Sequence, residues 1–73
     1  MQIDSVKRIM DLAESAGIYL GNGGYVRYDT KDSFEMQGKL LVLFNNRSDS
    51  AKSRAFVDID AISLIDIYKE KGA

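Results

Sequence analysis

The part of the sequence that most constrains the fold extends from Lys39 to Tyr68, because it contains two runs with the alternation typical of β-strands. In the first run, residues 39–45, successive side chains would point to opposite faces of the strand, and both faces are apolar. These apolar residues are Leu40, Val42 and Phe44 on one face and Leu41 and Leu43 on the other. Such a strand needs other parts of a protein packed against both of its faces. Residues 45–53 are rich in Asn, Ser and Asp, which favour turns, so we expect a hairpin loop there.

The second run begins at Arg54 and alternates apolar with mostly polar residues, as a half-buried antiparallel strand does. Ala55, Val57 and Ile59 would share one face, and Phe56, Asp58 and Asp60 the other. We expect a corner at residues 60–63. The following segment, residues 61–70, has two possible structures: a terminal helix with Asp60 as its N-cap, or one more strand. The strand is favoured because the apolar residues there are largely β-branched or aromatic and lack helical spacing.

The N-terminal residues predict an amphipathic helix over residues 4–16. Asp4 is a suitable N-cap, and Val6, Ile9, Met10 and Ala13 follow at helical spacing. Gly17 is expected to end this helix.

Two polar segments between the helix and residue 39 predict turns. Gly21-Asn22-Gly23-Gly24 tolerates positive φ and predicts either a hairpin turn between a strand starting at Ile18 and a strand over residues 25–28, or a sharp bend within one strand. A phosphate-binding loop is the alternative, but the Gly-Lys-Ser/Thr ending of that motif is absent. Residues 29–32 predict a second turn, and Gly38 a bulge or bend.

These elements predict one α+β domain over residues 1–73. Its N-terminal helix would pack on a strongly bent antiparallel sheet of about five strands within residues 18–68, forming a small β-barrel or roll of the SH3 or Sm type. A chain of 73 residues buries a small core, so oligomerisation or a partner would help to stabilise it.

The composition excludes several kinds of chemistry. The chain has no Cys and no His, and therefore lacks the usual zinc ligands and the commonest general base. We expect no enzyme activity, no cofactor and no metal. Asp58, Asp60 and Asp66 could hold a hard cation, but a solvated strand face is the preferred interpretation. No apolar run is long enough to span a membrane or to form a signal peptide, so a cytoplasmic protein without membrane contact is expected.

Two short segments resemble the Sm-like family, specifically its Hfq branch. One is Ile18-Tyr19-Leu20-Gly21-Asn22-Gly23, and the other comprises Val57, Ala61-Ile62-Ser63 and Ile65. The resemblance implies a ring-shaped homo-oligomer whose subunits join strand edges and bind single-stranded RNA. The family's Lys-His pair is replaced here by Ile59 and Asp60, which would remove a main RNA contact.

Nucleic-acid binding is also the alternative function that the charges suggest. Arg47, Lys52 and Arg54 surround the loop 45–53, and Tyr25, Arg27 and Tyr28 could add stacking and phosphate contacts. The net charge of −1 weakens this hypothesis, and a solvated loop with sheet-supporting tyrosines is preferred.

The leading hypothesis is a non-catalytic binding module that acts through protein contacts. Its apolar strands present more hydrophobic surface than a small domain can cover. The predicted interface residues are Leu41, Leu43, Ile62, Leu64 and Tyr68. Self-association into a homo-oligomer would cover them. A larger protein target would do so too, as for the small adaptors and inhibitors that bacteria and their phages encode.

Overall fold

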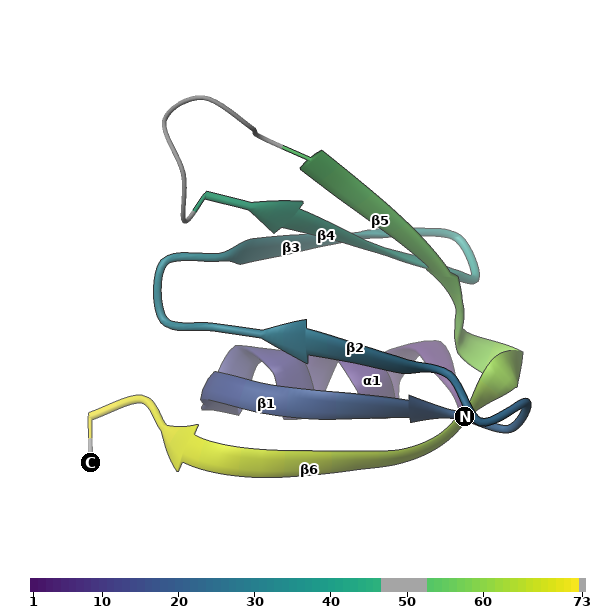
Figure 1. The fold of residues 1–73 in the computed structure, drawn as a ribbon, viewed down its shortest axis with the longest axis horizontal. Coiled ribbons are helices and arrows are strands. Elements are labelled where there is room, and N and C mark those ends of the chain that lie inside the picture. Colours follow the sequence, from purple (N-terminus) through teal and green to yellow (C-terminus); the bar gives the residue numbers. More distant parts are fainter. Residues whose placement is uncertain (47–52, 73) are drawn as a thin grey trace.

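The computed structural model describes residues 1–46 and 53–72, which form one N-terminal helix, six strands and one short 3-10 helix (Figure 1). In chain order the elements are α1 (Ile3–Leu12), β1 (Ala13–Leu20), β2 (Tyr25–Tyr28), β3 (Ser33–Gln37), β4 (Leu40–Asn45), β5 (Ser53–Asp58), η1 (Ile59–Ala61) and β6 (Ile62–Glu70). The α+β class is confirmed. Of these described helices, none has the length and apolarity that crossing a bilayer requires.

The strands form two three-stranded antiparallel sheets, with the orders β2-β1-β6 and β3-β4-β5. The prediction of a single bent sheet of about five strands, closed as a barrel or roll, is therefore wrong. The chain changes sheet at two points. Residues 29–32 lead from β2 to β3 through a turn in which the Asp32 amide donates to the Asp29 carbonyl (2.9 Å), and η1 leads back from β5 to β6.

The helix is shorter than predicted, and it does not begin at an aspartate cap. Gln2 occupies the N-cap position without a side-chain bond, and Asp4 lies in the first turn. Ala13 is already extended, and Gly17 lies inside β1 rather than at a helix end. Residues 13–20 form a central strand because pairing with β2 on one side and β6 on the other provides a backbone ladder along both edges.

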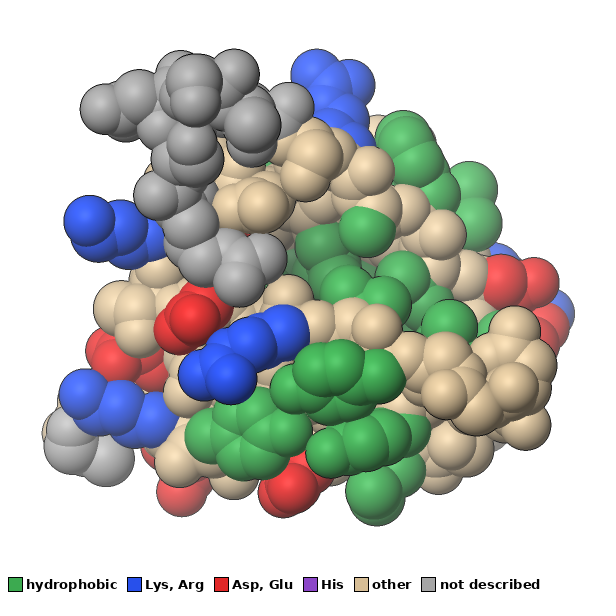
Figure 2. Space-filling view, viewed as in Figure 1, with side chains coloured by type: hydrophobic (Ala, Val, Ile, Leu, Met, Phe, Trp, Pro, Cys, Tyr) green, Lys and Arg blue, Asp and Glu red, His purple; other side chains and the backbone are tan. Residues whose placement is uncertain are grey.

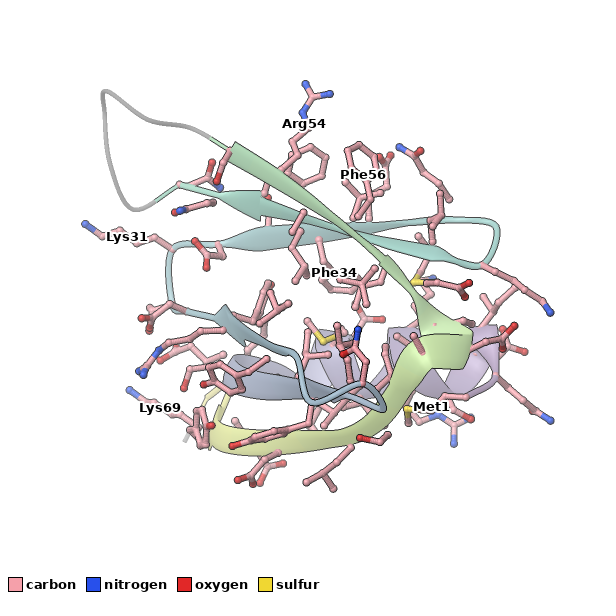
Figure 3. All side chains as sticks on the ribbon, turned by 45° about the vertical axis from the view of Figure 1, so that its right-hand side comes forward. Met1, Lys31, Phe34, Arg54, Phe56 and Lys69 are labelled. Carbon is pink, nitrogen blue, oxygen red and sulfur yellow. The ribbon has the colours of Figure 1, made fainter. Side chains whose placement is uncertain are left out.

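The core lies between the sheets and beneath α1, which contacts both β1 and β3 and so touches each sheet. Phe34 points from β3 into this space (Figure 3). The largest fully buried side chains are Met10, Ile18, Leu41, Ile59, Val6 and Val42. Most of the apolar pattern of the sequence is thus used to hold the two sheets and the helix together.

Most turns of the structure lie where the sequence predicted them. In the hairpin between β1 and β2, Gly23 has φ +91° and the Leu20 amide donates to the Gly24 carbonyl (2.8 Å). Gly38 has φ +59° and belongs to the turn between β3 and β4, so of the bulge or bend expected there the structure has the bend, in the form of a tight turn. The favoured strand after residue 61 is confirmed as β6, and the helical alternative is limited to η1.

Candidate functional site

Three tyrosines meet on the outer face of the β2-β1-β6 sheet. The strand register places Tyr19 of β1 opposite Tyr25 of β2 and Leu64 of β6. In the next row, Gly17 lies opposite Arg27. We call this surface the tyrosine face, defined as Gly17, Tyr19, Tyr25, Arg27, Leu64 and Tyr68. It forms a compact hydrophobic patch beside basic side chains in the lower part of Figure 2.

The three rings are linked through their hydroxyl groups. The Tyr68 hydroxyl lies 3.1 Å from that of Tyr25 and 3.3 Å from that of Tyr19. The rings of Tyr19 and Tyr25 have centroids 4.9 Å apart and are tilted by 55°. The hydrogen bond with Tyr19, and then that with Tyr25, raise the pKa of Tyr68 above its usual value. The raised pKa keeps the Tyr68 hydroxyl protonated at neutral pH, so it can donate as well as accept hydrogen bonds.

Arg27 and Gly17 complete the arrangement of the rings. The guanidinium carbon of Arg27 lies 5.8 Å from the centroid of the Tyr68 ring, within the range of a cation–π interaction, and its Nε atom lies 3.3 Å from Asp29. A Cβ atom at residue 17 would clash with the Tyr68 hydroxyl and would lie 2.9 Å from Tyr25. Glycine at this position leaves room for the hydroxyl end of the Tyr68 ring over β1.

A cleft of about 260 Å³ opens beside the tyrosine face, between β2 of one sheet and the β4–β5 pair of the other. It is visible as a hollow with hydrophobic side chains in the centre of Figure 2. We call it the inter-sheet cleft. It is lined by Tyr25, Val26, Arg27, Asp32, Leu43, Asn45, Ser53 and Ala55. Two of these residues, Tyr25 and Arg27, also belong to the tyrosine face, so the two surfaces are continuous.

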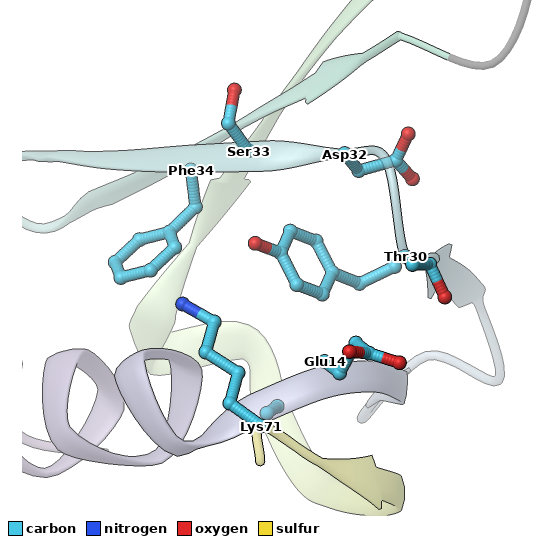
Figure 4. Close-up of a pocket in the computed structure, with 8 residues that line it drawn as sticks. Glu14, Thr30, Asp32, Ser33, Phe34 and Lys71 are labelled. Carbon is cyan, nitrogen blue, oxygen red and sulfur yellow. The ribbon is translucent and has the colours of Figure 1, made fainter.

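A second hollow, of about 540 Å³, lies between the start of β1 and the start of β3 (Figure 4). The Lys71 side chain extends into it toward Phe34, and Glu14 and Thr30 lie on its opposite side. Tyr28 lines the hollow, and burial, followed by the negative charges of Asp32 and Asp11, raises the pKa of its phenol. A phenol held in its protonated form is a poor general base, so Tyr28 does not supply a base to this hollow.

The outer face of the β3-β4-β5 sheet carries a second, smaller apolar surface. Phe56 is 58% exposed, and Leu40 is exposed on the neighbouring strand. Arg54 and Phe56 project outward from β5 in Figure 3. The Arg54 guanidinium lies 5.4 Å from the Phe44 ring centroid. No hydroxyl groups link these aromatic rings, because phenylalanine has none.

The predicted protein-interface residues separate into two groups. Leu41, Leu43 and Ile62 are buried in the core. Their exposed fractions are at most 6%, so none of them belongs to an exposed outer surface, and Leu43 is reached only through the floor of the inter-sheet cleft. Leu64 and Tyr68 are 55% and 46% exposed, and both lie on the tyrosine face. The sequence identified these two surface residues but did not separate them from the core residues.

The predicted nucleic-acid residues are also divided. Tyr25 and Arg27 come together on the tyrosine face, whereas Tyr28 is only 3% exposed and has no ring face available for stacking. Arg54 is exposed on the opposite sheet. Arg47 and Lys52 lie outside the described residues.

The aspartates considered for a cation have structural contacts. The Asp58 carboxylate accepts a hydrogen bond from the Asp60 amide (2.9 Å), and Asp60 lies 3.4 Å from the Lys39 Nζ atom. Asp66 is on β6, opposite Gly17 of β1. Within residues 1–46 and 53–72, no group of three acidic side chains is arranged to hold a metal ion.

Tyr19, Gly17 and the inter-sheet cleft were not identified from the sequence. A signal for Tyr19 was present, since a three-residue loop at residues 21–23, one of the common hairpin lengths, places residues 19 and 25 opposite each other. Gly17 carried no such signal, because a glycine after an apolar helical pattern is equally typical of a helix end. The chain matches no family model, no curated protein and no solved structure.

Proposed function

We propose that this domain is a non-catalytic binding module that acts through contact with another protein chain, and that the tyrosine face makes this contact. The observation that carries the proposal is the joining of Tyr19, Tyr25 and Tyr68 into one exposed, hydroxyl-linked cluster over Gly17. Tyrosine and arginine are the residues most enriched at the energetic centres of protein interfaces, and this surface combines three tyrosines with Arg27.

The arrangement of the cluster favours affinity. Binding costs less when the side chains are already ordered, and here Tyr68 is held by two hydroxyl contacts, by Arg27 and by the flat backbone of Gly17. The hydroxyl groups can also exchange partners with backbone groups of the bound chain. Leu64 adds exposed apolar surface next to the rings. Together these residues supply an apolar centre with polar groups around it.

Site-specific photo-crosslinking tests this proposal. A benzophenone amino acid replaces Leu64 on the tyrosine face, and a matched variant carries it at Phe56, which has similar exposure on the other sheet. We expect a discrete crosslinked protein species from residue 64 in cells and much less from residue 56. Adding Tyr68→Ala to the residue-64 variant should remove the species. Equal crosslinking from both positions, or none from residue 64, would contradict the proposal.

The size of the crosslinked species distinguishes a second copy of this chain from a different protein. Sedimentation velocity of the purified protein provides an independent measurement of self-association. A homo-oligomer that dissociates in the Tyr68→Ala variant would identify the partner as the chain itself. A monomeric purified protein with a larger crosslinked species would indicate a separate target.

An Sm-like, oligomeric RNA-binding protein is the second candidate. The two segments with that resemblance lie side by side, since the Gly21 amide donates to the Ala61 carbonyl (2.8 Å) and the Ser63 hydroxyl to the Tyr19 carbonyl (3.1 Å). Strands β5 and β6 each pair on one side only within the described residues, which leaves edges for neighbouring subunits. These contacts support the resemblance in fold more than in RNA chemistry, because Asp66 and the overall charge of −1 disfavour phosphate.

Titration with single-stranded RNA tests this second candidate. The RNA hypothesis expects affinity that falls steeply with salt and is reduced by Arg27→Glu, with Lys7→Glu on α1 as the control. Native mass spectrometry should show a ring that carries nuclease-sensitive mass. A protein without RNA affinity at low salt would exclude this candidate and leave the protein-binding proposal in place.

A further inference from the structure

Strand β2 has a backbone edge that faces the inter-sheet cleft. In the described part of the chain, β2 pairs with β1 and with no other strand. The cleft is lined by three consecutive residues of β2, Tyr25, Val26 and Arg27. Successive side chains of a strand point to opposite faces, so a cleft that touches all three must extend along the edge of the strand.

The opposite wall of the cleft is the inner face of the β4–β5 pair. Leu43 of β4 is in register with Ala55 of β5, and Asn45 is in register with Ser53. With Val26, residues Leu43 and Ala55 give the cleft an apolar floor. A volume of about 260 Å³ accommodates a large aliphatic side chain and is too narrow for a helix, whose diameter is roughly 10–12 Å.

Charged side chains of both signs lie beside this edge. Arg27 is half exposed, and Lys31 is exposed in the turn that follows β2 (Figure 3). The neighbouring carboxylates have partners: Asp29 contacts Arg27 at 3.3 Å, and Asp32 accepts hydrogen bonds from the backbone amides of Asp29 (2.9 Å) and Asn46 (3.1 Å). The Arg27–Asp29 pair carries no net charge and Asp32 stays a carboxylate held in place by backbone amides, so Lys31 is the cation that a segment passing along β2 would meet, and it favours an acidic residue beside it.

We propose that the inter-sheet cleft binds an extended, acidic segment of a partner protein, which adds as a strand to the free edge of β2 and inserts an aliphatic side chain between Val26, Leu43 and Ala55. This inference rests on the proposed function and specifies how the partner is bound. Main-chain hydrogen bonds to β2 supply affinity, the apolar floor selects the inserted side chain, and Lys31 selects the flanking charge. The tyrosine face, which shares Tyr25 and Arg27 with the cleft, then contacts the remainder of the partner.

A random peptide display library, selected on the full purified chain, provides the first test. We expect the selected peptides to share an aliphatic residue with acidic residues near it and to lack proline at the centre. In amide NMR spectra, the best peptide should shift the signals of Tyr25–Tyr28 and of the β4 and β5 residues at the cleft. A selection that yields no peptide, peptides without this pattern, or signal changes confined to other strands would overturn the proposal.

Three amino-acid substitutions then separate the contribution of the apolar floor to peptide affinity from that of Lys31. Ala55→Leu should fill the cleft and weaken the selected peptide at least about tenfold. Lys31→Glu should weaken it roughly two- to fivefold at low salt and less at high salt. Arg54→Glu is the matched control, because the Arg54 side chain lies on the outer face of β5, and it should leave the affinity unchanged.

A modified peptide tests strand addition without altering the protein. Methylation of alternate backbone nitrogens removes the donors that would pair with β2, and only one of the two possible methylation patterns blocks that edge. We expect one pattern to abolish binding and the other to preserve it. Equal binding of both methylated peptides would overturn strand addition. Because crosslinking from residue 64 does not involve the cleft, failure here is distinguishable from failure of the proposed function.

Discussion

The hydroxyl group of Tyr68 lies over Gly17 of the adjacent strand, in the space that a side chain at residue 17 would occupy. The same hydroxyl contacts the hydroxyls of Tyr19 and Tyr25. A position without a side chain therefore determines where three aromatic rings meet. The stability of this part of the sheet and the shape of its outer surface depend on the same glycine.

Substitution Gly17→Ala should displace Tyr68 and lower the free energy of unfolding by about 1–3 kcal/mol, because the added methyl group overlaps the tyrosine cluster. Gly21→Ala is the matched control, since its nearest neighbour would be the Ala61 carbonyl at an ordinary distance of 3.7 Å. Urea denaturation of both variants measures the difference. Similar stabilities for the two variants would show that Tyr68 moves aside without cost.

Stability should fall at alkaline pH. The pKa of Tyr28 is raised mainly by burial, and that of Tyr68 by its hydrogen bonds, from the usual 10.0. Since the folded state favours the protonated phenols, their contribution is complete below pH 10.0 and is lost as the pH rises through the folded pKa values. We expect a tyrosinate absorbance titration to show late-titrating phenols that Tyr28→Phe and Tyr68→Phe each reduce. A single step at the usual value for all four tyrosines would contradict this.

Leu41 of β4 and Leu64 of β6 should differ sharply in their contribution to stability. Leu41→Ala removes a fully buried side chain and should cost about 2–5 kcal/mol in the free energy of unfolding. Leu64→Ala, on the exposed tyrosine face, should change it by at most roughly 0.5 kcal/mol while reducing partner binding. Thermal and urea unfolding of both variants provide the comparison. An equally large loss of stability for Leu64→Ala would place that residue in the core.

Asp58 should stabilise the return from the second sheet to the first. Its carboxylate accepts a hydrogen bond from the Asp60 amide at the start of η1, so Asp58→Ala should lower the free energy of unfolding by about 1 kcal/mol. Asp66→Ala, which removes an exposed carboxylate from β6, is the control and should have a smaller effect. Denaturation of the two variants at neutral pH tests the difference, and the reverse order would exclude a capping role for Asp58.

The local pattern of the sequence was sufficient to predict the strands and most turns. The alternation in residues 40–45 and 53–58 corresponds to β4 and β5, and the Gly21–Gly24 turn lies between β1 and β2. These features depend on neighbouring residues, which the sequence displays directly. The start of β1 could not be predicted from neighbouring residues in this way. Ala13, Glu14 and Ala16 favour a helix by themselves, and they become a strand because β6, from the opposite end of the chain, pairs with them.

The grouping of strands and the exposure of their residues were harder to predict, since an alternating strand looks the same in one sheet or in two. The turn at residues 29–32 was expected, but its role as the crossing between sheets depends on which strands pair beyond it. In the same way, Leu41 and Leu64 both lie in segments predicted as strands and were both predicted as interface residues, and the packing places one in the core and the other on the surface. The sequence thus identified the residues of the strands, but it did not show which of their side chains face the core and which face the solvent.

The order of strands also has a consequence for the sequence of events in folding. Strands β3, β4 and β5 are joined by successive hairpins, whereas Tyr19 and Tyr68 are 49 residues apart along the chain. Contacts of such long range form slowly, and during synthesis β1 has no β6 to pair with until the last strand has left the ribosome. Pulsed hydrogen exchange during refolding should therefore protect the amides of β4 before those that join β1 to β6. The tyrosine face, which needs Tyr68 of β6, then forms later than the β3-β4-β5 sheet, so a chain to which β6 has not yet been added cannot hold the partner through this face.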